Sequence, residues 1–102
     1  MILDRYEGVA FVIVEARTVD GVVQLTSWQG DDICYWGGVL HLTSLKDRDL
    51  VVASAHVFLT TGGPEVYVTV GPGDEPDGPL AVTGHGEPPF GAPDRGGGLR
   101  WA

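Results

Sequence analysis

Ionisable side chains within apolar, strand-like runs are the residues of this chain best suited to chemistry. His56 lies near the middle of the run LVVASAHVFLT (50–60), and Glu15 directly follows VAFVIV. Tyr67 lies opposite the valine face of the run 65–70. An imidazole and a carboxyl group in a water-poor barrel can exchange protons with a bound substrate. We therefore predict general acid/base chemistry with His56, Glu15 and Tyr67 as the catalytic residues.

Aromatic and polar side chains of neighbouring runs would hold the substrate. Tyr35 and His41 fall on one face of the run 33–43, because side chains separated by an even number of positions in a strand point the same way. Aromatic rings supply the apolar walls that hydrophobic ligands need. The predicted substrate-binding residues are Tyr35, His41, Trp36, Phe58 and Trp28.

Each of these assignments has a structural alternative. His56 can be a hydrogen-bonded structural histidine, and Glu15 can pair with Arg17 at a strand edge. The tryptophans and Phe58 can equally be ordinary core or barrel-wall residues. The sequence leaves both interpretations open.

Other kinds of chemistry lack their motifs. Cys34 lies between apolar residues, where a free thiol usually behaves as a small buried hydrophobe, and no nucleophile elbow surrounds a serine. No CxxC, HxH or HExxH spacing is present, and the Asp-rich turns lack the ligand spacing of a calcium loop. The glycine-rich segments 62–64 and 96–98 do not resemble phosphate loops. We expect no metal and no other cofactor.

Composition limits the class of protein. A chain of 102 residues has room for one domain, expected at 1–90, followed by a Gly-rich tail at 91–102. The net charge of −8 disfavours nucleic acid and anionic membranes as partners. The single cysteine and the absence of a leader-like or membrane-length apolar segment predict a cytoplasmic protein. The expected partner is a hydrophobic small molecule.

Short apolar runs separated by glycine and proline predict an all-β fold. The runs 6–19 and 22–28 flank Asp20-Gly21, a strong hairpin signal. Gly37-Gly38 interrupts the third run, where a kink or the close approach of another backbone is expected. Six such runs predict an antiparallel meander closed into a β-barrel or roll, within one chain or completed by a homodimer. The remaining expected strands are 50–60, 65–70 and 80–85.

Several short segments resemble a small actinobacterial domain of unknown function that occurs alone or attached to flavin-dependent monooxygenases. The similarity covers roughly residues 6–90 and includes YEGVA (6–10), YWGG (35–38) and VTGHGEPPF (82–90). The family's Trp-Gly-Arg sequence is replaced here by Trp36-Gly37-Gly38, so no role of that arginine carries over.

In size, acidity and expected architecture the chain is also similar to the small barrel cyclases that form spiroacetals in polyketide and antibiotic biosynthesis. That resemblance implies a cofactor-independent cyclase that adds two hydroxyl groups to one ketone and releases water. The alternative is a non-catalytic binding or docking module for a hydrophobic metabolite or a partner monooxygenase. This alternative is based on the absence of a group of catalytic residues close together in the sequence.

Overall fold

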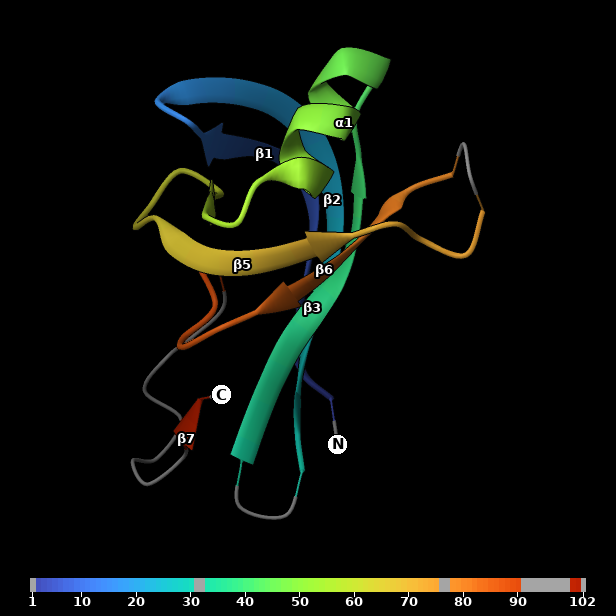
Figure 1. Cartoon of the computed structure of the whole chain (residues 1–102). Helices are drawn as coiled ribbons and strands as arrows, with labels where there is room; N and C mark the ends of the chain where they lie inside the picture. Colours follow the sequence, from blue (N-terminus) through green and yellow to red (C-terminus); the bar gives the residue numbers. More distant parts are fainter. Residues whose placement is uncertain (1, 31–32, 76–77, 91–99, 102) are drawn as a thin grey trace.

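The chain folds into a closed, six-stranded antiparallel β-barrel (Figure 1). The computed structural model describes residues 2–30, 33–75, 78–90 and 100–101. The expected all-β barrel is confirmed, and its ring closes within one chain. The elements are β1 (Ile2–Val14), β2 (Arg17–Gln29), β3 (Ile33–His41), α1 (Leu45–Ala53), β4 (Val57–Thr60), β5 (Val66–Gly71), β6 (Leu80–Gly84) and β7 (Arg100–Trp101).

The order of strands around the ring is β2-β1-β4-β5-β6-β3, and β3 pairs with β2 to complete it. Strands β1, β2 and β3 form consecutive hairpins. The chain then crosses to the far side of β1, where β4 pairs, so the order departs from a simple meander at this one connection. Strands β5 and β6 follow in sequence, and β6 pairs with β3.

The run 50–60 was expected to be one strand, and that prediction is wrong for its first part. Residues 45–53 form α1, and only Val57–Thr60 form a strand. Ser44 caps the helix: its Oγ accepts a hydrogen bond from the Asp47 amide at 3.4 Å. The fully buried Val51 packs into the barrel core. Capping and packing together outweigh the strand preference of the β-branched residues.

The first hairpin turns earlier than expected. Glu15 and Ala16, with φ of 50° and 64°, form the two-residue turn, and both have the left-handed φ typical of a type I′ turn. The predicted turn at Asp20-Gly21 is wrong because these residues lie within β2, where Gly21 faces Ala10. A Cβ at Gly21 would lie within 2.9 Å of the Leu40 and Leu42 side chains, so packing explains the glycine.

Strict alternation of side chains fills the barrel interior. The valines of β5 show it: Val68 and Val70 are buried, whereas Tyr67 and Thr69, on the opposite face as predicted, are exposed. Small and medium aliphatic side chains of every ring strand meet inside. The interior residues include Ala10, Val12, Val14, Val23, Leu25, Leu40, Leu59, Val68 and Val82.

The segment 85–90 covers the side of the barrel opposite α1. Phe90 packs between Tyr6 and Trp36, with ring centroids 6.0 Å from each. The Trp36 indole Nε1 donates a 2.9 Å hydrogen bond to the Gly86 carbonyl, and Gly86 has a φ of 76° that favours glycine. The motif VTGHGEPPF (82–90) thus contains the end of β6 and the segment that packs Phe90 against Tyr6 and Trp36.

The β2–β3 hairpin extends beyond the ring. β3 pairs with β2 from Cys34 to His41 but with β6 only from Gly37 to Leu40. Figure 1 shows the first part of β3, which pairs with β2 but not with β6, running past β6 and away from α1. β7 pairs in parallel with the start of β3 at Ile33 and Cys34. The rest of the predicted tail, residues 91–99 and 102, lies outside the described residues.

Candidate functional site

The predicted catalytic residues lie on the outside of the barrel. His56, Glu15 and Tyr67 are exposed, and so are His41 and Tyr35. Ser27 is the one buried polar residue among the side chains that the structure describes. The expectation of a polar interior is therefore wrong, because the aliphatic residues of each strand, such as Val57 and Leu59 in β4, occupy the inward positions.

Glu15 and His56 nevertheless lie at neighbouring positions, just beyond the paired ends of β1 and β4. Val14 of β1 pairs with Val57 of β4, so Glu15 and His56 are the next positions of that register. Glu15 turns away into the β1–β2 loop with its left-handed φ. Within the described part of the chain, neither a hydrogen bond nor an ion pair joins Glu15 to His56.

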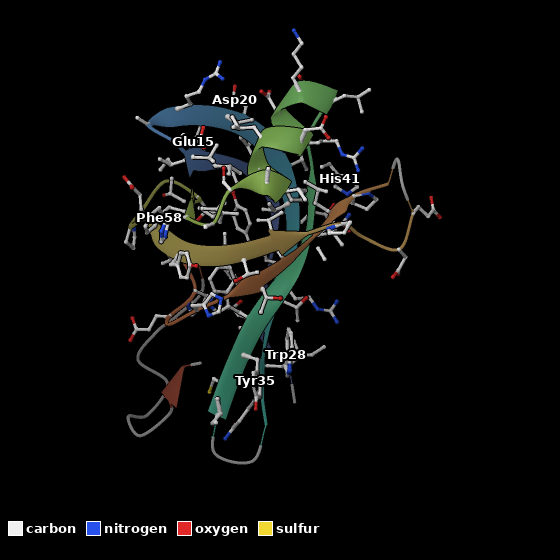
Figure 2. All side chains as sticks on the ribbon, viewed as in Figure 1. Glu15, Asp20, Trp28, Tyr35, His41 and Phe58 are labelled. Atoms are coloured by element: carbon white, nitrogen blue, oxygen red, sulfur yellow. The ribbon has the colours of Figure 1, made fainter. Side chains whose placement is uncertain are left out.

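The two predicted polar substrate-binding residues, Tyr35 and His41, are far apart. Tyr35 and His41 share the outer face of β3, as expected, but lie six residues apart, which is roughly 20 Å along a strand. Figure 2 shows them at opposite ends of β3. His41 is paired with Val22 of β2, whereas Tyr35 is paired with Trp28. They do not form one site.

A row of rings crosses the outer face of β4, β5 and the end of β6. Phe58 and Tyr67 are register partners with centroids 5.8 Å apart, and Tyr67 stacks on His85 at 5.1 Å. His56 lies 6.4 Å from Tyr67 on the other side. The His85 Nε2 is 2.7 Å from the Thr69 hydroxyl, a hydrogen bond that fixes the imidazole.

A second aromatic pair lies on the extended hairpin. Trp28 of β2 and Tyr35 of β3 are register partners, with ring centroids 6.1 Å apart and planes inclined by 27° (Figure 2). Their exposed fractions are 38% and 41%, which leaves their outer surfaces open to a ligand. Trp36, in contrast, is 1% exposed and belongs to the core.

A surface hollow of about 350 Å³ separates the two aromatic groups. On the outer face of β3, the position between Tyr35 and Val39 is Gly37, which adds no side chain to the lining of the hollow. A Cβ there would lie 2.5 Å from the Val82 carbonyl oxygen, so β6 approaches too closely for any other residue. We call this space the Gly37 hollow. It lies among Trp28, Tyr35, Gly37, Thr83, Gly84 and His85.

Three of the predicted substrate-binding residues, Trp28, Tyr35 and Trp36, line the Gly37 hollow, although the sequence had placed them in the barrel interior. The close backbone approach expected at Gly37-Gly38 is also confirmed. Thr83 and His85 were missed as site residues. Their signal was the VTGHG sequence, which placed an imidazole just after a strand.

The lining favours an uncharged, largely apolar ligand. The described lining residues include no Asp, Glu, Lys or Arg, and their polar side-chain atoms belong to Thr83, His85, Tyr35 and the tryptophans. Such a site offers ring contacts and a few hydrogen bonds. The fold and the site together define a small closed β-barrel with an aromatic-walled hollow on its outer surface.

Comparisons with protein-family models, with curated proteins and with solved structures found no match to this chain. In the described ranges, no helix combines the length and the apolar character that crossing a membrane requires.

Proposed function

We propose that the protein is a non-catalytic binding module that holds a hydrophobic small molecule in the Gly37 hollow. The observation that carries this proposal is the convergence of exposed aromatic residues on one hollow, while aliphatic side chains fill the barrel interior. Exposed aromatic side chains are the ones that gain most from covering by an apolar ligand. The barrel then acts as a rigid support for a site on its outer surface.

The position of the site on the strands supports this proposal. Trp28, Tyr35 and Thr83 belong to three adjacent strands of a closed ring, so backbone hydrogen bonds fix their spacing. A ligand that binds to such a preformed surface does not have to order it first, which preserves affinity.

Fluorescence titration with Nile red, a neutral apolar dye, tests the binding function. We expect saturable binding to the full chain, and Trp28→Ala should weaken it about tenfold because it removes one wall of the hollow. Phe11→Ala is the matched control, since Phe11 is also 38% exposed but lies on β1. Equal loss in both variants, or no loss in either, would refute binding at the hollow.

The spiroacetal cyclase is the second candidate, and one observation favours it. The Tyr67 ring lies between two imidazoles, His56 and His85, and Glu15 is the register neighbour of His56. Such a group could accept the hydroxyl protons and help a water molecule leave when two hydroxyls add to one ketone. In this version of the proposal the chemistry takes place on the outer surface of the barrel.

Turnover of a dihydroxy ketone tests the cyclase. We expect His56→Phe to lower the rate of spiroacetal formation at least about 100-fold and to leave the melting temperature nearly unchanged, because His56 is exposed. His41→Phe provides the matched control, since this exposed histidine lies at the far end of β3. Activity that survives in His56→Phe would remove His56 from the mechanism.

A further inference from the structure

Backbone forms part of the floor of the Gly37 hollow. At Gly37 the outer face of β3 carries no side chain, and the adjoining strand β6 contributes the backbone around Thr83 and Gly84. Gly37 and Gly84 are themselves buried, and Thr83 carries the exposed side chain of this floor. A preference for a flat ring therefore comes from the walls of the hollow rather than from its floor.

The walls of the hollow are aromatic on both sides. On one side the Trp28–Tyr35 pair is stacked with an interplanar angle of 27°, and on the other the lining residue His85 stacks at the same angle on Tyr67, which lies behind it. Aromatic pairs favour offset-stacked or edge-to-face contacts, which contribute beyond the area that they bury. A flat ligand ring could make such contacts with both walls at once.

The polar groups of the site indicate which polar substituents a ligand ring would carry. The Thr83 hydroxyl has no hydrogen-bond partner within the described ranges, and the Nδ1 nitrogen of His85 lies outside the bond to Thr69. Both can exchange a hydrogen bond with a hydroxyl or carbonyl oxygen. The net charge of −8 disfavours a carboxylate or phosphate ligand.

We propose that the ligand of the Gly37 hollow is a flat, uncharged aromatic ring system that carries a phenolic hydroxyl or a ring carbonyl. This inference rests on the binding function proposed above. The ring lies between the Tyr35 and His85 rings, and its oxygen meets Thr83 or His85. A volume of about 350 Å³ is near the lower end for small-molecule sites, which suits two or three fused rings.

Two compounds with one carbon skeleton test the requirement for flatness. The ¹⁵N-labelled full chain is titrated by NMR with 2-naphthol, which is flat, and with decahydro-2-naphthol, which is saturated and puckered. We expect 2-naphthol to bind at least about fivefold more tightly. Its ring current should also shift the amide signals of Gly37, Thr83 and Gly84 upfield. Tyr35→Leu keeps the wall apolar and should abolish most of the preference, whereas Phe11→Leu should not change it.

The outcomes separate this proposal from the binding function. Equal affinities for the two compounds, with shifts confined to the hollow, would refute the flat-ring ligand and leave the binding module standing. If neither compound shifted the amide signals at the hollow, the binding module itself would be refuted. A preference for 2-naphthol that persists in Tyr35→Leu would place the ring elsewhere and overturn the proposed geometry.

Discussion

Replacement of Trp36 by alanine is expected to lower the free energy of unfolding by about 3–5 kcal/mol. The side chain is 1% exposed and packs edge-to-face against Phe90, so the substitution leaves a large cavity beneath the hollow. It also removes the indole donor of the 2.9 Å bond to Gly86. Since small domains are stable by about 5–15 kcal/mol, the variant should be close to unfolding. Urea denaturation followed by far-ultraviolet circular dichroism measures the loss.

Two variants make this prediction specific. Trp28→Ala removes a tryptophan that is 38% exposed and should cost less than about 1 kcal/mol. Trp36→Phe keeps an aromatic ring but loses the hydrogen bond to Gly86, and an intermediate loss is expected. If Trp36→Ala and Trp28→Ala were equally stable, Trp36 would not be a core residue.

Gly84→Ala is expected to destabilise the barrel by about 1–3 kcal/mol, near the upper end of this range, although it adds a single methyl group. A Cβ at Gly84 would lie 1.8 Å from Cε2 of Trp36, so either the indole or β6 must move. The cost is one of overpacking, because the φ of Gly84 is not left-handed. The same urea experiment measures it.

Gly71→Ala is the matched control because Gly71 also ends a strand but has no atom within 4 Å of the position of a Cβ. Its stability should change by less than about 0.5 kcal/mol. Combining Gly84→Ala with Trp36→Leu removes the clashing indole, so the two losses should not add. Additive losses in this double variant would mean that Gly84 and Trp36 do not interact as described.

Periodicity predicted the strands well where it was unambiguous. The alternation Val66, Val68, Val70 identified β5 and placed its valines on one face. It failed at residues 50–53, where β-branched residues favoured a strand but a Ser44 cap and the burial of Val51 produce the last part of α1. It also failed at the first turn, because Asp20-Gly21 is a strong local hairpin signal whose glycine is required for packing against Leu40.

The site was predicted less completely, because a single strand does not reveal which of its faces is buried. His56 and Phe58 share a face that could have lined the interior, and only the pairing of Val57 and Leu59 with neighbouring strands makes it the outer one. Gly37 lies where β6 approaches β3 closely, and its lack of a side chain does not reveal from the sequence that a hollow lies beside it. Trp28 and His85 flank it from strands separated by more than fifty residues, and only the closure of the ring brings them together.

Ring closure by β6 also determines whether the sheet has free edges. Strands β5, β4, β1, β2 and β3 make a continuous antiparallel sheet, and β6 then pairs with both of its ends. Without β6, the edges of β5 and of β3 at residues 37–40 have no strand partner, and exposed strand edges are templates for pairing with other chains. The five residues of β6 therefore remove two edges at once.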